Sequence, residues 1–93
     1  MSEYRIRYTT PYLRKEARFL KQHPEIIPQY KKTVTLLKAN PNHPSLRLHK
    51  LKGHLQDVRS VSINLSYCIT IEFIIQDKLI IPVMVGSHDQ AYQ

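Results

Sequence analysis

Histidine and lysine residues gather at two places in the sequence, one near the middle and one near the end. The residues of these two groups are His49, Lys50, Lys52, His54, His88, Asp89 and Tyr92. Imidazole and ammonium groups together can cleave RNA without a metal ion. A base takes the proton of the 2′-hydroxyl, an acid protonates the leaving 5′-oxygen, and cations stabilise the charge on the phosphorane. RNA cleavage is therefore one chemistry that these residue types allow.

Plainer explanations fit the same residues. His88 has the position of a surface histidine near a chain end, and His49 that of a loop residue packed beside Leu48. Lys50 and Lys52 fit a solvated basic run. Histidines alone at such spacing give weak support for a zinc site, so we expect neither a metal ion nor another cofactor.

Several other kinds of site are excluded by the composition. The chain has two glycines and one cysteine, which leaves no glycine-rich nucleotide loop, no intramolecular disulfide and no multi-cysteine metal site. It also contains neither an HExxH sequence nor a nucleophile elbow. The carboxylates in the second half of the chain fall in separate predicted elements, so no two of them are expected to form a catalytic pair.

Three apolar segments separate the two groups of candidate residues. Val61, Ile63 and Leu65 alternate with polar residues, which predicts a strand buried on one face. Further strands are predicted within residues 69–75 and 79–85, where β-branched residues dominate. Connections as short as these join antiparallel neighbours, so the segments should form a three-stranded meander. Such a meander can bring the start of one strand close to the end of another, and with them the candidate residues.

A strand and a helix are expected before the meander. Residues 4–8 alternate and predict a short first strand, and Thr9 or Thr10 can cap a helix that has Pro11 in its first turn. Leu13, Ala17 and Leu20 are spaced as the buried stripe of this helix, with Tyr12 and Phe19 flanking it, and the helix should end near residues 23–24.

A second helix should cover most of residues 25–39, and Pro28 allows regular helix only from about its own position. Its apolar stripe would consist of Ile27, Tyr30, Val34 and Leu37. Residues 40–41, Asn-Pro, end this helix, so that the two helices form a hairpin that can cover one side of the sheet.

Residues 46–57 should be extended or irregular and anchored by Leu46, Leu48 and Leu51. Pro82 lacks a backbone donor, which predicts a bulge or an unpaired edge in the third meander strand.

The sequence thus predicts one α+β domain over residues 1–93, with helices on one side of a mostly antiparallel sheet. The net charge is +7 and it is uneven, because residues 1–59 contain 13 Lys or Arg against 4 Asp or Glu. A basic half suggests a polyanion such as RNA or DNA, and an acidic protein or a merely solvated surface fits equally well. The chain lacks an apolar stretch long enough for a membrane span and has no signal-peptide pattern at its start, so we expect a cytoplasmic protein.

The run NPNHPSLRLHKLKG, the strands that follow it and the ending GSHDQAY resemble the RelE/ParE toxin superfamily of toxin–antitoxin modules. The likeness is greatest to RelE/YafQ-type mRNA interferases and covers nearly the whole chain. It implies an endoribonuclease that cuts mRNA on the ribosome and is neutralised by a cognate antitoxin.

The resemblance also assigns roles to individual residues. His88 matches a histidine of acid/base catalysis, His49 a second histidine, and Lys50 and Lys52 a basic pair; we take His88, His49 and Lys52 as the catalytic group. Lys50, Arg59 and Arg47 are expected to contact RNA phosphates, while the substrate contacts expected are Tyr92, Asn64 and Ser66.

Departures from the family pattern fall at the centre of the expected site. Cys68 stands where many members have arginine, Ser66 near the position of an aspartate, Ser62 near that of another histidine, and Asn64 near that of a basic residue. Two alternatives therefore remain open. One is a ParE-like gyrase inhibitor without nuclease activity, and the other is a degenerate toxin homologue that keeps only antitoxin or nucleic-acid binding.

Overall fold

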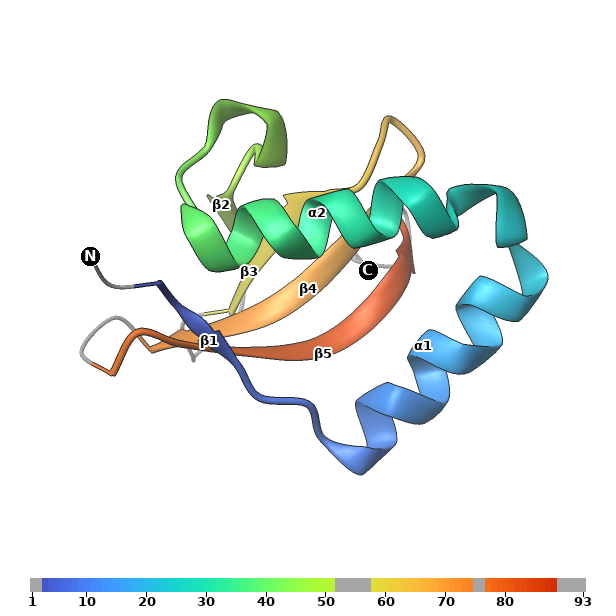
Figure 1. Cartoon of the computed structure of the whole chain (residues 1–93), viewed down its shortest axis with the longest axis horizontal. Helices are drawn as coiled ribbons and strands as arrows, with labels where there is room; N and C mark the ends of the chain where they lie inside the picture. The colour runs from blue at the N-terminus through green and yellow to red at the C-terminus, as the bar shows by residue number, and fades with distance from the viewer. Residues whose placement is uncertain (1–2, 52–57, 75–76, 89–93) are drawn as a thin grey trace.

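The computed structural model describes residues 3–51, 58–74 and 77–88. Two helices lie on one face of a five-stranded sheet whose order is β1-β5-β4-β3-β2 (Figure 1). The strands are β1 Arg5–Ile6, β2 His49–Lys50, β3 Val58–Ser62, β4 Tyr67–Ile74 and β5 Leu79–Ser87. The pairs β2–β3, β3–β4 and β4–β5 are antiparallel, and β1 is parallel to β5. The predicted α+β class, first strand and meander are confirmed.

The first helix, α1 Thr10–Gln22, begins as predicted. Thr9 is its N-cap, and the Thr9 hydroxyl accepts the backbone N–H of Tyr12 at 3.2 Å. The predicted buried stripe was wrong at Leu13, which is 45% exposed, and at Ala17, which is exposed, whereas Leu20 packs against the core as predicted. Tyr12 and Phe19, which were expected to flank the stripe, are buried. The two larger rings remove more apolar surface from water, so they decide which face of α1 meets the sheet.

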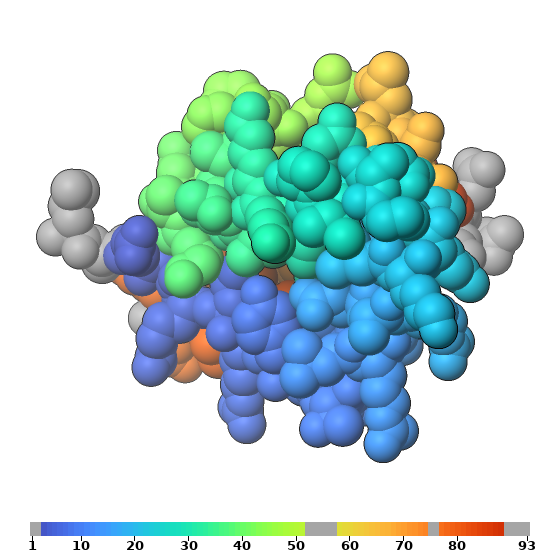
Figure 2. All heavy atoms as spheres, turned by 45° about the vertical axis from the view of Figure 1, so that its right-hand side comes forward, coloured from blue at the N-terminus to red at the C-terminus, as the bar shows by residue number. Residues whose placement is uncertain are grey.

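A single 3-10 turn, η1 Pro24–Ile26, connects α1 to α2 Ile27–Ala39. Pro28 lies in the first turn of α2, where its missing N–H costs nothing, and Asn40 caps the other end, as expected. The two helices diverge from η1 as a V, with α2 crossing in front of the sheet and α1 lying beside β5 (Figure 1). In Figure 2 they occupy the facing surface, α1 in blue and α2 in teal. None of the described helices is long and apolar enough to cross a membrane.

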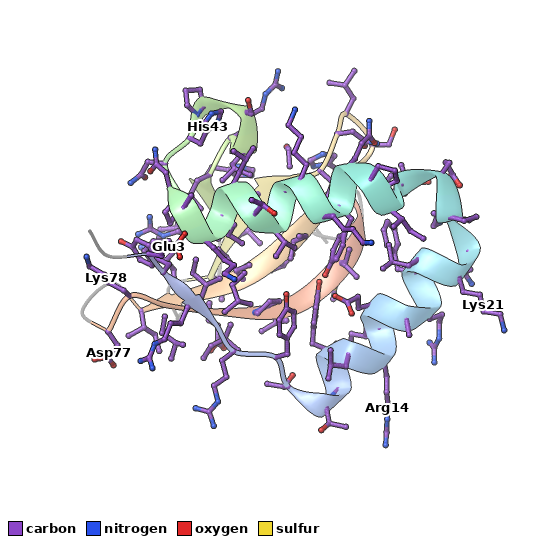
Figure 3. All side chains as sticks on the ribbon, viewed as in Figure 1. Glu3, Arg14, Lys21, His43, Asp77 and Lys78 are labelled. Carbon is purple, nitrogen blue, oxygen red and sulfur yellow. The ribbon has the colours of Figure 1, made fainter. Side chains whose placement is uncertain are left out.

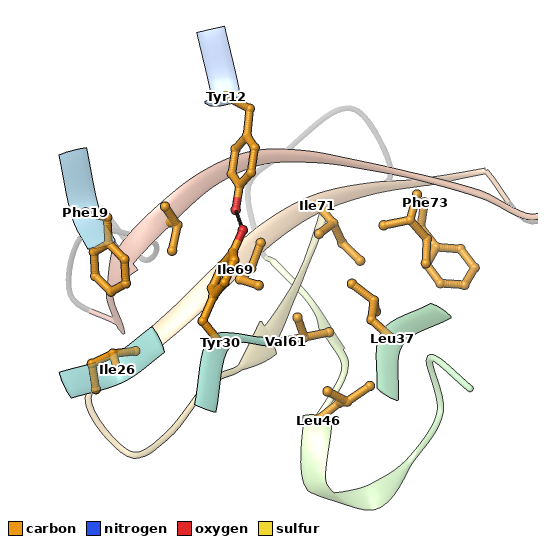
Figure 4. Packing of buried hydrophobic residues seen from close by; sticks show 12 residues of the cluster. Tyr12, Phe19, Ile26, Tyr30, Leu37, Leu46, Val61, Ile69, Ile71 and Phe73 are labelled. Carbon is orange, nitrogen blue, oxygen red and sulfur yellow. Dashed lines mark hydrogen bonds between the residues drawn. The ribbon is translucent and has the colours of Figure 1, made fainter. Parts of the chain in front are cut away.

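The core lies between the helices and the sheet (Figure 4). Along each strand, every second residue points to the helix side and joins the core. Val61, Ile69 and Ile71 are among these residues. The hydroxyl of Tyr12 lies 2.7 Å from that of Tyr30 on α2, and the Tyr30 hydroxyl donates to the Glu16 carboxylate at 2.5 Å. Polar groups that would otherwise be buried without partners are thus bonded to one another.

The segment before the meander is anchored by leucines, as predicted. Leu46 ends the 3-10 turn η2 Pro44–Leu46 and is 1% exposed, Leu51 is 4% exposed, and Leu48 packs against the core. Leu65 was expected to be a buried strand residue, which was wrong, since β3 ends at Ser62 and Leu65 is 87% exposed. It lies in the turn between β3 and β4, where the Asn64 side chain accepts the backbone N–H groups of Ser66 and Tyr67.

The predicted bulge is present in β5. Thr70 pairs with Met84, whereas Ile71 pairs with Pro82, so Val83 is the extra residue. The Val83 carbonyl accepts a hydrogen bond from the Lys15 ammonium of α1 at 3.2 Å. The bulge removes the Val83 carbonyl from the regular strand pairing, and a side chain of α1 supplies its hydrogen-bond donor.

Candidate active site

Two of the predicted catalytic residues line one cavity of about 320 Å³. Its walls come from the segment before β2, from β2 and β3, from the β3–β4 turn, and from the residue that follows β5. The lining residues are Arg47, His49, Ser62, Asn64, Leu65 and His88. We call this space the histidine cavity. No Asp or Glu within the described segments lines it, so Arg47 gives it a positive charge.

His49 is placed by the turn that precedes β2. Arg47 ends η2 in the left-handed conformation, with φ 51° and ψ 46°, at a cost of about 1 kcal/mol for a non-glycine residue. The strand then begins, and His49 pairs with Ser60 of β3. The Nδ1 atom of His49 lies 2.8 Å from the Arg47 carbonyl. A carbonyl only accepts, so Nδ1 carries a proton, and Nε2 is the basic nitrogen of the neutral ring.

His88 is placed by the β3–β4 turn. Its backbone N–H donates to the Ser66 carbonyl at 3.1 Å, and its Nε2 atom lies 3.2 Å from the Asn64 carbonyl. Nε2 is therefore the protonated nitrogen, and Nδ1 is the basic nitrogen of the neutral ring. Main-chain carbonyls thus orient both histidine rings, and they select opposite tautomers.

Asn64 holds the turn together. Its side-chain oxygen accepts the backbone N–H groups of Ser66 at 2.8 Å and Tyr67 at 2.9 Å, which is the bonding of an Asx turn. Its side-chain nitrogen donates to the Gln29 side chain of α2 at 3.1 Å. Ser66, predicted to be a substrate contact, is exposed beside the cavity and is not among the residues that line it.

Lys50 and Arg59 lie apart from the histidine cavity. The two residues pair with each other across β2 and β3, directly next to the His49–Ser60 pair. Because neighbouring residues of a strand point to opposite faces, the Lys50 and Arg59 side chains lie on the other face of the sheet from His49. The guanidinium carbon of Arg59 lies 5.2 Å from the centre of the Phe73 ring, where a cation–π contact forms. Lys52, His54, Asp89 and Tyr92 lie outside the described residues.

The centre of the expected site consists of small uncharged residues. Ser62 pairs with Cys68 across β3 and β4, and Cys68 pairs with Gly86 of β5. Cys68 is 1% exposed, and its burial raises the pKa of the thiol, an effect that the Ser60 hydroxyl reduces only in part. A buried thiol with a raised pKa is a poor nucleophile, so Cys68 acts here as a packed strand residue.

Among the described residues, no three His, Cys, Asp or Glu side chains cluster closely enough to hold a metal ion. One lining residue, Leu65, was missed at the sequence level because alternation alone placed it in the core. Its polar neighbours Asn64 and Ser66 were the available signal, since Asn and Ser favour turns.

The fold is shared with proteins from toxin–antitoxin complexes. No protein-family model matches the sequence, and no curated protein matches it either. Among solved structures, YafQ of E. coli is similar over 98% of this chain and 100% of its own, with a TM-score of 0.75 and 15% identity. The E. coli DinJ–YafQ toxin–antitoxin complex gives a TM-score of 0.76 at 18% identity, covering 98% and 99% of the two chains. The YoeB–YefM complex of Staphylococcus aureus gives 0.69 at 15% identity, covering 94% and 99%.

Proposed function

We propose that this protein is the toxin of a type II toxin–antitoxin module and a ribosome-dependent mRNA endoribonuclease. The observation that supports this most directly is that His49 and His88 line one cavity together with Arg47. The shared fold supports the same class, because similar structures include a toxin in complex with its antitoxin. Ribosomes, mRNA and a cognate antitoxin would then be the partners, and the cytoplasm the location.

The chemistry requires the two histidines in opposite protonation states. A neutral ring takes the 2′-hydroxyl proton through its basic nitrogen, which is Nε2 in His49 and Nδ1 in His88. The 2′-oxygen attacks the phosphorus atom, and the protonated ring gives its proton to the departing 5′-oxygen, leaving a 2′,3′-cyclic phosphate. Arg47 stabilises the negative charge of the phosphorane. In this proposal Lys52 adds a catalytic cation and Tyr92 contacts the substrate.

The test is mRNA cleavage in a reconstituted translation reaction, mapped by primer extension. Wild type should give ribosome-dependent cuts, and His88→Gln should lose them, because glutamine keeps an N–H that can reach the Asn64 carbonyl but cannot transfer a proton at neutral pH. A loss of about 100-fold or more is expected for an acid/base residue. Circular dichroism must show an unchanged fold. Cuts retained in His88→Gln would refute its catalytic role.

A second candidate is a toxin homologue that binds an antitoxin or nucleic acid without cutting RNA. The observation that favours it is the uncharged centre of the site, where Ser62 pairs with the buried Cys68. A folded wild type that binds RNA but gives no cuts would select this candidate. Stabilised cleaved complexes of DNA gyrase would select a ParE-like inhibitor instead.

A further inference from the structure

A second cavity of about 330 Å³ lies on the other side of the same strand ends. Tyr67 of β4 pairs with Ser87 of β5, and the Tyr67 ring packs on the helix side of the sheet. His88, the residue after Ser87, lines the histidine cavity on the other side. The second cavity is enclosed by α1 and by the ends of β4 and β5. It is lined by Lys15, Arg18, Phe19, Gln22, His23, Tyr67, Val85, Gly86 and Ser87. We call it the α1 cavity.

Three aromatic rings form one wall of the α1 cavity. The ring centres of Phe19 and Tyr67 are 5.2 Å apart, and the His23 ring centre lies 4.9 Å from each of them. The Tyr67 hydroxyl is 3.4 Å from Nδ1 of His23, which joins the two more exposed rings. Phe19 is buried, while His23 and Tyr67 are partly exposed and so offer ring surface to a ligand.

Two cations face the same space. Lys15 is held over the β5 bulge by its bond to the Val83 carbonyl, which uses one of its three N–H donors. Arg18, one turn further along α1, is exposed. No acidic side chain of the described residues lines the cavity, although the Glu25 carboxylate lies 3.9 Å from Nδ1 of His23 beside its aromatic wall. The lining itself is therefore cationic and can attract an anion. Cations at the rim of an aromatic wall are the combination that binds single-stranded nucleic acid.

We propose that the α1 cavity binds one nucleotide of single-stranded RNA. The base stacks on the partly exposed rings of Tyr67 and His23, and the adjoining phosphate contacts Lys15 and Arg18. This inference deepens the proposed function and rests on it, because it names a second subsite for the same RNA substrate. A strand that passes over the Tyr67–Ser87 pair places one nucleotide here and a neighbouring one in the histidine cavity. An acidic peptide would satisfy the cations but would leave the rings without a stacking partner.

The first test measures binding of a labelled single-stranded RNA octamer by fluorescence anisotropy, in a His88→Gln background so that the RNA stays intact. Arg18→Gln should weaken binding and lower the salt dependence of log K by about 0.7, the value for one phosphate contact on a single strand. Tyr67→Leu should weaken binding by about 5- to 150-fold, which corresponds to about 1–3 kcal/mol for one stacked base.

Arg14→Gln is the matched control, since it removes the same charge from the same helix at a side chain that points away from the sheet (Figure 3). Equal effects of Arg14→Gln and Arg18→Gln would overturn the inference, because they would reflect net charge alone. Competition by a polyglutamate peptide as strong as that by unlabelled RNA would also overturn it.

The second test separates this inference from the proposed function. With His88 intact, Arg18→Gln should lower mRNA cleavage at limiting substrate, with kcat less affected than KM. Wild-type cleavage that Arg18→Gln leaves unchanged would refute the α1 cavity as a substrate subsite and leave the nuclease proposal standing. A wild type that gives no cuts at all would refute the nuclease proposal itself.

Discussion

Removing the Tyr30 hydroxyl should destabilise the protein more than removing the Tyr12 hydroxyl, although the two side chains are of one type and both are buried. Tyr30 gives its only proton to Glu16, so in the 2.7 Å contact between the tyrosines Tyr12 is the donor and Tyr30 the acceptor (Figure 4). Tyr30→Phe therefore breaks two hydrogen bonds, whereas Tyr12→Phe breaks one.

The magnitudes follow from those bonds. A hydrogen bond to a charged group contributes about 1.5–3 kcal/mol, and a buried hydroxyl left without its acceptor costs about 1–3 kcal/mol. Glu16 is partly exposed, which favours the lower ends of these ranges, so Tyr30→Phe should lower the free energy of unfolding by about 3 kcal/mol. Tyr12→Phe leaves the Tyr30–Glu16 bond intact and should cost about 1 kcal/mol.

The assay is urea unfolding at pH 7, followed by circular dichroism, with both single variants and the double variant. The double variant should cost less than the sum of the single variants, because they share one bond. A Tyr12→Phe variant that is as destabilising as Tyr30→Phe would refute the assigned donor order, and strictly additive effects would refute the bond between the two hydroxyls.

Three further predictions concern stability and reactivity. Burial raises the pKa values of both Tyr12 and Tyr30 above the ordinary value of 10.0, so the unfolded chain loses these protons first as the pH rises. The free energy of unfolding should therefore be insensitive to these groups below pH 10 and fall above it, and a series of urea curves in which Tyr12→Phe does not reduce the alkaline fall would contradict this. Thr9→Ala should cost about 1 kcal/mol in urea unfolding, since it deletes the α1 cap, whereas Thr9→Ser should retain most of the stability; equal losses would show that the cap hydroxyl is unimportant. Cys68 should react with a thiol reagent at the rate of unfolding in native buffer and at once in urea, because it is 1% exposed and its pKa is raised; rapid native labelling would show that the site is open.

The fold could be predicted from local patterns because turn and cap residues act over a few positions. Pro28 and Pro82 marked the start of α2 and the β5 bulge, and both effects follow from the missing proline N–H. The buried face of α1 could not be chosen in this way. Leu13 has the better apolar spacing, but Tyr12 and Phe19 have larger rings, and Tyr30 on another element supplies the partner that lets the Tyr12 hydroxyl be buried.

The candidate site shows the same limit. The two histidine segments could be predicted to meet, because an antiparallel meander brings strand ends together. The separation of Lys50 and Arg59 from the histidine cavity depends on the register of β2 against β3, which alternation alone does not fix. The α1 cavity was not predicted, because its cations and rings come from a helix and from a strand end more than forty positions away.

The main-chain anchoring of both histidines has a consequence for how the protein tolerates substitution. The carbonyls of Arg47 and Asn64 orient the rings, and each carbonyl is present whatever side chain its residue has. Replacement of Ser62, which lines the cavity, can thus change its charge and shape without altering which nitrogen of each ring carries the proton. The charge and shape of the cavity can therefore vary independently of the tautomers of the two histidines, as long as the backbone of the β3–β4 turn and of the Arg47 turn is preserved.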